Sequence, residues 1–359
     1  MRFPEFTEEW VNVSLKDVAD FQKERISSGL LDESTYISTE NILQNFQGVQ
    51  SAISIPANTN VVAYKKNDIL LSNIRPYLKK VWFSDKIGGC SADVFVLRSK
   101  TCEPEFLYNV IASDKFINYV MSGVKGVKMP RGDKNQMESF SFSIPAVAEQ
   151  RKISQLFQLL DERIATQNKI IEKLQSLIKG IAQHCIKEST SGNTYVKLGD
   201  ICQITTGKLD ANAQVDNGIY PFFTCAEQPF KIDSFAFDTE ALLISGNGAN
   251  LGYINYYKGK FNAYQRTYVL DLFSENIQYI KWALKVLLPK RIAIEKSSSN
   301  TPYIVLSTLT DLRLPIPCKS KQSFIANLMQ SLERKLSNQI AQYDSYNYLK
   351  QYLLRQMFI

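Results

Sequence analysis

Apolar residues recur in alternating steps of four and three along two long segments, Ile153–Lys187 and Ile325–Ile359. This spacing is the heptad pattern of a helix that buries one narrow apolar stripe against a partner helix. Each segment corresponds to a helix of ~55 Å, and the other segment is the nearest matching partner. We call the stripe the seam. Its positions are Ile153, Phe157, Leu160, Ile164, Gln167, Ile171 and Leu174 in the first segment, and Ile325, Met329, Leu332, Leu336, Gln339 and Tyr343 in the second.

The chain contains an internal repeat. An offset of 172 residues places Ile153 on Ile325 and Pro145 on Pro317, and a nearby offset of 173 places Val96 on Val269. A constant offset over a helix and the segment before it indicates duplication. The sequence therefore predicts two globular halves that alternate with two helices. The predicted boundaries are 1–148 for the first globular half, 149–190 for the first helix, 191–318 for the second half and 319–359 for the second helix.

The chain order favours antiparallel packing of the two helices, because one helix leaves each globular half. The halves are then expected at opposite ends of the helix pair. The polar seam positions Gln167 and Gln339 are equivalent in the repeat, and a paired polar layer fixes the register of a coiled coil. A rigid spacer is favoured over an incidental tether, since a loose tether needs no seam this regular.

Each globular half alternates short β-rich runs with turns. One helix is predicted in each half, around Glu105–Met121 and Gln278–Leu288. Each half then ends in a strand, Phe140–Pro145 or Asp311–Pro317. This order predicts an α+β fold in which two duplicated domains with mixed sheets are separated by two long antiparallel helices that form a coiled coil.

The composition adds a mild basic bias, with 42 Lys and Arg against 35 Asp and Glu, a formal charge of +7. Such a charge permits a polyanionic partner without requiring one. No stretch is long and apolar enough to cross a membrane, and the N-terminus does not resemble a secretory signal, so a cytoplasmic protein is expected. The six cysteines are widely spaced and are expected to be reduced and mostly buried. His184, the single histidine, excludes a histidine-rich metal site.

Basic side chains and aromatic rings are interleaved in the polar loops of both halves. Lysine and arginine bind phosphates, while arginine and asparagine also contact base edges in the major groove. A solvated basic surface is the alternative, but two copies at equivalent places favour double-stranded DNA. The candidate DNA-binding residues are Lys65, Arg75, Tyr77, Lys79, Lys80, Lys125, Lys128, Arg131 and Lys134 in the first half, and Lys208, Asn247, Asn250, Lys258, Arg266, Lys296, Asn300 and Tyr303 in the second.

Motifs that would carry chemistry are incomplete. Asn73–Tyr77 has only the ends of the Asn/Asp-Pro-Pro-Tyr motif of a methyltransferase. Ser245–Gly252 is rich in glycine, but no helical pattern follows it, which argues against a phosphate loop. Glu333–Lys335 is the one Glu-x-Lys and lies on the predicted coiled coil. The chain is therefore predicted to be a non-catalytic DNA-binding subunit. A stand-alone methyltransferase or nuclease and a coiled-coil interaction scaffold stay open as alternatives.

Three segments resemble the specificity subunit of type I restriction–modification systems. They are Arg2–Phe6 with Trp10 and Leu15, Ile144–Pro145 followed by Glu149–Ile153, and the closing Leu353–Ile359. The resemblance implies that each half is a target recognition domain for one half of an asymmetric, bipartite DNA site. It also implies that the helices fix the gap and dock two modification subunits, to which restriction subunits are added.

The same resemblance implies that this chain binds no cofactor. S-adenosylmethionine, ATP and Mg are expected in the partner subunits, which methylate adenine and cleave DNA. The second copy departs from the pattern, because Lys321–Gln322 stands where the first copy has Glu149–Gln150. The resemblance is therefore weaker at the start of the second helix.

Overall fold

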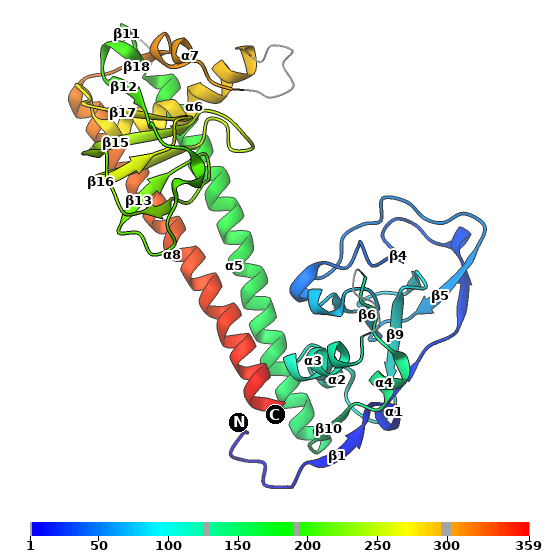
Figure 1. Ribbon diagram of the computed structural model, residues 1–359. Helices are drawn as coiled ribbons and strands as arrows, with labels where there is room; N and C mark the ends of the chain where they lie inside the picture. Colours follow the sequence, from blue (N-terminus) through cyan, green and yellow to red (C-terminus); the bar gives the residue numbers. More distant parts are fainter. Residues whose placement is uncertain (1, 125–128, 190–193, 296–302, 359) are drawn as a thin grey trace. The chain divides into compact units, whose positions relative to one another are not determined.

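The computed structural model describes residues 2–124, 129–189, 194–295 and 303–358, which form two compact units. Unit 1 comprises Met1–Asn168 and Ala341–Ile359, and unit 2 comprises Lys169–Ile340. Each unit thus combines one globular half with parts of both long helices, α5 (Val147–Glu188) and α8 (Lys319–Met357) (Figure 1). Within the described ranges, no helix is long and apolar enough to span a bilayer.

Unit 1 is built from two four-stranded sheets and a pair of strands beside α5. The first sheet has the order β2-β9-β6-β7, the second has the order β3-β5-β8-β4, and β1 pairs with β10. The pairings are antiparallel except for β4 with β8, so the second sheet is mixed. The strands are β1 (Val11–Ser14), β2 (Ala19–Phe21), β3 (Arg25–Ser27), β4 (Tyr36–Ile37), β5 (Asn60–Tyr64), β6 (Ile69–Ser72), β7 (Val81–Phe83), β8 (Gly88–Cys90), β9 (Val94–Ser99) and β10 (Ser141–Ile144). The helices are α1 (Leu15–Val18), α2 (Pro104–Ile111), α3 (Asp114–Ser122) and α4 (Lys134–Glu138), with short 3-10 turns at Ser28–Leu30 (η1), Gln44–Phe46 (η2) and Pro76–Leu78 (η3).

The central strand β6 is buried on both faces, which explains its unbroken apolar sequence. Ile69 and Leu71 face a core that includes Phe106 of α2. Leu70 lies in a second core shared with Tyr64 of the other sheet. The first sheet is therefore the middle layer of unit 1.

Unit 2 has one six-stranded sheet of order β12-β17-β15-β16-β13-β14 and a separate pair formed by β11 and β18. Its strands are β11 (Thr194–Lys197), β12 (Gln203–Thr206), β13 (Tyr220–Phe223), β14 (Phe230–Ile232), β15 (Phe237–Ser245), β16 (Ile254–Ala263), β17 (Thr267–Asp271) and β18 (Arg313–Ile316). The sheet is mixed, because β13 and β16 run parallel. The helices are α6 (Ile277–Glu295) and α7 (Leu306–Thr310), with 3-10 turns at Leu198–Asp200 (η4) and Ala211–Ala213 (η5).

The two units repeat a common framework. The order β12-β17-β15-β16 in unit 2 matches β2-β9-β6-β7 in unit 1. Ser72 pairs with Val94 in one unit, and Ser245 pairs with Thr267 in the other. The predicted α+β fold with duplicated domains and mixed sheets is confirmed. The units differ in what extends the framework, a second sheet in unit 1 and the strands β13 and β14 in unit 2.

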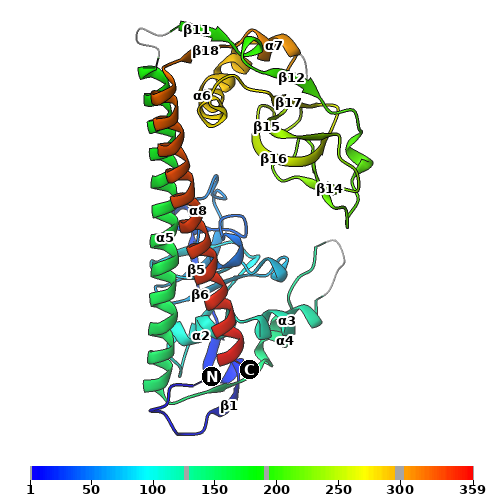
Figure 2. The ribbon, with the colours of Figure 1, turned by 90° about the vertical axis from the view of Figure 1, so that its left-hand side faces the viewer.

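Opposite ends of the two long helices meet in each unit, so their packing is antiparallel (Figure 2). In unit 1 the start of α5 meets the end of α8, where the rings of Phe157 and Phe358 stack. In unit 2 the second half of α5 shares a core with Ile325 and Met329 of α8. Buried seam residues are Ile153, Phe157, Gln167, Ile171, Leu174, Ile325 and Met329, and the half-buried ones are Leu160, Ile164, Leu332, Leu336, Gln339 and Tyr343.

Several sequence predictions need correction. The single helix expected at Glu105–Met121 is two helices, because Ser113 interrupts it. The Ser113 hydroxyl accepts a hydrogen bond from the amide of Phe116, which caps the start of α3. The second predicted helix runs on through Pro289 to Glu295. The cysteines agree with the expectation that most of them fill the core. All six are free thiols; Cys90 and Cys102 are buried, Cys185 and Cys202 pack against the core of unit 2, and Cys225 and Cys318 lie outside these cores.

A buried glutamine fixes the start of each long helix. The Gln150 side chain donates to the carbonyl of Pro145 at 2.8 Å and accepts from the amide of Glu103 at 2.9 Å. Gln322 repeats the first of these bonds with Pro317 at 2.9 Å and accepts from the amide of Asn276 at 3.0 Å. The duplication therefore keeps a hydrogen-bond pattern as well as an apolar one.

The acidic residue beside this glutamine in the first copy is a lysine in the second. Glu149 is fully buried and accepts hydrogen bonds from Arg2 at 2.8 Å and from the indole of Trp10 at 3.3 Å. Lys321, its equivalent, instead donates to the backbone carbonyl of Glu188 at 3.1 Å. The start of α8 thus lacks an acidic anchor but keeps the glutamine.

Replacing Gln150 or Gln322 by alanine is expected to destabilise its own unit by about 2 kcal/mol or more, because each change strands a buried amide and a buried carbonyl. Hydrogen exchange, measured separately for peptides of each unit at increasing temperature, reports the loss of stability. Gln158, which is exposed and donates to Glu162 in the same helix, is the matched control, and Gln158→Ala is expected to change little. Equal effects of all three variants would contradict the structural role of the glutamines.

Candidate nucleic-acid interface

Three separate segments of unit 1 meet where β6 ends, and their backbones hydrogen-bond to one another. The amide of Asn73 donates to the carbonyl of Asp93, just before β9, at 2.8 Å. The carbonyl of Asn73 accepts from the amide of Gly132 at 3.0 Å, and Ile74 forms an isolated β-bridge with Arg131. We call residues 72–75, 93 and 130–132 the β6 frame. These backbone bonds hold three loops together, and the side chains of all three loops project from the frame.

The β6 frame displays cationic and aromatic side chains. Arg75 is exposed and has a backbone φ of 51°, in the left-handed region that residues other than glycine rarely adopt. Tyr77, in the η3 turn that follows, is 49% exposed. Arg131 donates from Nη1 to Oδ1 of Asp93 at 2.9 Å, and both side chains stay partly exposed. These groups can contact phosphates or base edges.

Other candidates in unit 1 have structural partners. Lys79 forms an ion pair with Asp114, and Arg355 of α8 donates to the same carboxylate at 2.7 Å. The hydrogen bond from Lys79, followed by that from Arg355, lowers the pKa of Asp114 and keeps it ionised. Lys80 donates to the backbone carbonyl of Thr39 at 2.6 Å. Lys79 and Lys80 therefore help to hold loops in place.

Lys65 and Lys134 are not part of the β6 frame, although Lys134 begins α4 only two residues after Gly132. Lys65 pairs with Glu24 at 3.2 Å, and both side chains are more than half exposed. Lys134 pairs with Glu138 at 3.3 Å, and its ammonium lies over the ring of Phe21. Exposed pairs of this kind are weak and readily exchanged for phosphate. Two further candidates of the first half, Lys125 and Lys128, lie outside the described residues.

Unit 2 repeats this backbone arrangement where β15 ends. The amide of Gly246 donates to the carbonyl of Arg266, just before β17, at 2.8 Å. The carbonyl of Gly246 accepts from the amide of Ile304 at 2.8 Å, and Asn247 forms an isolated β-bridge with Tyr303. We call residues 245–248, 266 and 303–304 the β15 frame. Its fourth residue, Gly248, has a φ of 79° and is the repeat equivalent of Arg75.

Different side chains project from the β15 frame. Arg266 and Tyr303 are exposed, the latter by 59%. Asn247 accepts a hydrogen bond from the Cys225 thiol at 3.0 Å, and Asn250 donates to the backbone carbonyl of Cys225 at 3.0 Å. These bonds tie the loop that follows β13 to the frame. The amide groups of both asparagines keep further donor and acceptor capacity.

The remaining candidates of unit 2 lie on the sheet or on loops. Lys208 is exposed. Lys258 pairs with Glu240 at 3.6 Å, and Tyr256 also donates to Glu240, at 2.7 Å. Burial, followed by this bond to a carboxylate, raises the pKa of Tyr256, which therefore stays protonated. Lys296 and Asn300 lie outside the described residues.

Sequence reasoning missed Asp93 and Cys225. A single acidic residue and a single cysteine carry no motif, and their contacts arise only when distant loops meet. The internal repeat held a usable signal, because at an offset of 173 Asp93 falls on Arg266, which was a candidate. An acidic residue at the equivalent of a basic candidate marks a position where the two halves differ.

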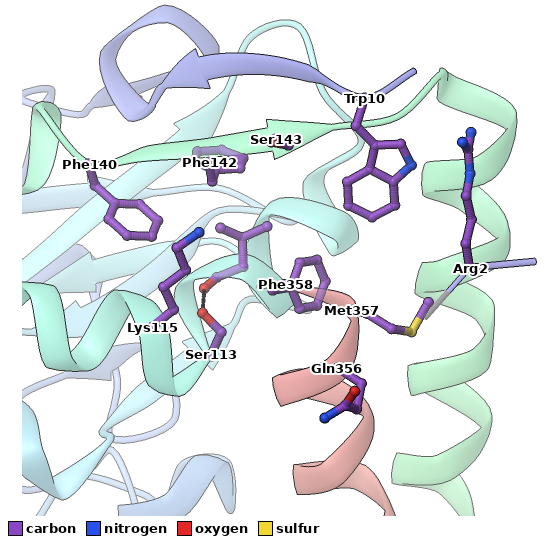
Figure 3. Close-up of a pocket in the computed structure, with 11 residues that line it drawn as sticks. Arg2, Trp10, Ser113, Lys115, Phe140, Phe142, Ser143, Gln356, Met357 and Phe358 are labelled. Carbon is purple, nitrogen blue, oxygen red and sulfur yellow. Dashed lines mark hydrogen bonds between the residues drawn. The ribbon is translucent and has the colours of Figure 1, made fainter. Parts of the chain in front are cut away.

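A pocket of about 390 Å³ in unit 1 lies apart from these candidates (Figure 3). Its lining mixes aromatic rings from β10 and its neighbours with the end of α8. The lining residues are Arg2, Trp10, Val110, Ser113, Lys115, Phe140, Phe142, Ser143, Gln356, Met357 and Phe358. No candidate DNA-binding residue named above is among them. In the parts of the chain that the structure describes, no group of three or more His, Cys, Asp or Glu side chains is arranged to hold a metal ion.

Comparison with known proteins identifies the family. A family model described as the type I restriction modification DNA specificity domain matches residues 7–176 and again residues 190–343. The chain belongs to this family. The two matched segments follow the internal repeat, so each globular half, with part of the helix that follows it, corresponds to one specificity domain.

Individual relatives carry the same description. The specificity subunit of the type I restriction enzyme EcoDI of Escherichia coli is 44% identical over 137 residues, which are 38% of this chain and 30% of that protein. This match thus spans less than a third of the relative's length. The MjaVIII specificity subunit of Methanocaldococcus jannaschii is 23% identical over 91% of this chain and 86% of that protein. The crystal structure of a type I restriction–modification S subunit from M. genitalium matches with a TM-score of 0.67 at 17% identity, covering 98% of this chain and 96% of that one, and so shares the fold of this specificity-domain protein.

Proposed function

We propose that the chain is the DNA specificity subunit of a type I restriction–modification complex. Each globular half reads one half of an asymmetric, bipartite site in double-stranded DNA. The observation that carries the proposal is the frame itself, which occurs twice with the same backbone bonds and different exposed side chains. Reading two different half-site sequences requires different base-contacting side chains. The two frames present such side chains from the same backbone arrangement.

The helix pair sets the gap between the two words and docks two modification subunits. Its long paired seam gives a stiffness that a flexible linker lacks. The modification subunits supply S-adenosylmethionine and methylate adenine. Restriction subunits, which use ATP and Mg, complete the nuclease. This chain contributes recognition and geometry and performs no catalytic step.

Two other functions are less well supported. An interaction scaffold accounts for the helix pair but gives no reason for exposed arginines on two equivalent frames. A stand-alone methyltransferase or nuclease finds no support in the descriptions of the relatives, which are specificity subunits. Methyl transfer by the purified chain alone would revive that last alternative.

DNA binding by the complex with its modification subunits is expected to weaken steeply with salt. Each phosphate that Lys or Arg neutralises releases condensed counterions. With about six such contacts, the affinity falls about a thousandfold between 50 and 200 mM salt. A gel-shift titration with cognate DNA measures the slope.

The control is a duplex of the same length in which both words are scrambled. If the chain is a specificity subunit, the complex is expected to bind the cognate duplex much more tightly than the scrambled one at every salt concentration. A flat salt response with no preference for either duplex would favour the scaffold instead.

A further inference from the structure

The two frames present different charges at equivalent backbone positions. In the β6 frame, the residue before β9 is Asp93 and the bridge residue is Arg131. In the β15 frame, the corresponding residues are Arg266 and Tyr303. An ion pair in one unit is thus exchanged for an arginine and a tyrosine in the other. The exchange falls where the two units share the same backbone hydrogen bonds and β-bridge.

The ion pair of the β6 frame leaves most of the arginine fork available. Arg131 uses Nη1 for its bond to Asp93, and a guanidinium has five N–H donors in a fixed plane. The Arg131 side chain is 52% exposed and that of Asp93 is 37% exposed. The pair therefore lies at the surface, where its stabilising effect on the fold is small. The pair nevertheless restricts the orientation of the guanidinium plane, because the carboxylate of Asp93 holds Nη1 of Arg131.

Arg131 is anchored at both ends. Its backbone forms the bridge with Ile74, and the amide of Gly132, the next residue, donates to Asn73. The side chain is held by Asp93, which is itself placed by the bond from the amide of Asn73. An arginine fixed in this way loses little freedom when it binds a planar acceptor pair. The acceptor pair in the major groove that suits a guanidinium fork is O6 and N7 of guanine.

We propose that Arg131 reads a guanine in the first half-site and that Asp93 is the positioning residue that orients its guanidinium. The inference rests on the proposed function and names a base for one of its recognition loops. In the β15 frame the arginine stands instead at the equivalent of Asp93, as Arg266, and the equivalent of Arg131 is Tyr303. The two words differ because the frames hold their arginines at different places.

The test compares one variant that keeps the charge with one that keeps the shape, both in the complete complex with its modification subunits. Arg131→Lys keeps the charge and loses the fork, while Asp93→Asn keeps the shape and loses the carboxylate. DNA binding is measured against the cognate duplex and against every single-base variant of both half-sites. Lys65→Ala, a charge removal elsewhere in unit 1, is the control.

Arg131→Lys is expected to reduce discrimination at one G·C pair of the first half-site by about tenfold or more. Asp93→Asn is expected to reduce discrimination at the same pair and nowhere else. Lys65→Ala, which removes a candidate phosphate contact, is expected to weaken binding to all sequences alike. Unchanged discrimination in Arg131→Lys would overturn the inference. So would an effect of Asp93→Asn at a different pair, because Asp93 would then read a base itself.

The two levels of the proposal fail in different ways. If the unmodified complex does not distinguish the cognate from a scrambled duplex, the proposed function is wrong. If it does distinguish them but the Arg131 and Asp93 variants behave as the unmodified complex does, only the assignment of the guanine contact is wrong. Thermal unfolding of both variants, expected to match that of the unmodified chain, excludes misfolding as the cause.

Discussion

A chain that ends at Tyr346 is expected to lose the fold of unit 1 while unit 2 stays folded. The missing segment is the end of α8, which enters the core of unit 1. Leu353, Leu354, Met357 and Phe358 are all more than nine-tenths buried there. The Phe358 ring also contacts Phe106 of α2. The first recognition domain is therefore completed by the last residues of the chain.

The size of the effect follows from the buried area. Full burial of a large apolar side chain contributes about 1.5–3 kcal/mol, so four of them contribute at most about 6–12 kcal/mol. That equals the whole stability of a typical domain, about 5–15 kcal/mol. Hydrogen exchange of peptides from β6 and β15 reports on the two units separately. Protection of β6 is expected to be lost and protection of β15 kept.

Two point variants bracket the truncation. Phe358→Ala is expected to destabilise unit 1 by about 3 kcal/mol or more, as for other buried aromatic residues. Tyr348→Ser changes a side chain of the same helix that is 72% exposed, and it is expected to have no effect. Full protection of β6 in the truncated chain would show that unit 1 folds without α8.

Lengthening both helices by one heptad is expected to widen the gap in the recognised site and leave both words unchanged. The insertions go between Asn168 and Lys169 in α5 and between Ile340 and Ala341 in α8, where the two units meet in sequence. Seven residues keep the seam in register and add about 10 Å to a helix. At about 3.4 Å per base pair, the gap grows by up to about three base pairs.

Sequencing of methylated sites in a host that expresses the altered complex reports the words and the gap together. The control is the same heptad in α5 alone, which puts the seams of α5 and α8 out of register and is expected to weaken assembly. A double insertion that assembles, methylates and recognises the original gap would contradict the spacer role of the helix pair.

Regular patterns made much of this fold predictable. The seam and the duplication each repeat at a fixed period, and β6 and the end of β15 are unbroken apolar runs, so sequence alone reveals all of them. The break at Ser113 was missed because a single capping residue interrupts a continuous apolar pattern. The extension of α6 through Pro289 was missed because tertiary packing overrode the proline signal.

The candidate site was predictable only in outline. Arg75, Arg131, Arg266 and Tyr303 were found as basic or aromatic loop residues, and the structure places them on the two frames. The ion pair of Arg131 with Asp93 was not predicted, since it joins loops separated by 38 residues. Lys79 was selected for its charge, but its bond to Asp114 is a fold contact that composition cannot distinguish from a DNA contact.

The antiparallel pairs β1–β10 and β11–β18 place the entrance and exit of each globular half side by side. A globular half can therefore be replaced by another at these two strands, because the points where the chain enters and leaves the half are adjacent. The buried glutamine at the start of each long helix makes the same hydrogen bond to a proline carbonyl in both copies. A grafted half must also keep its contacts with the long helices, because the core of unit 1 includes Phe157 of α5 and Leu353 of α8.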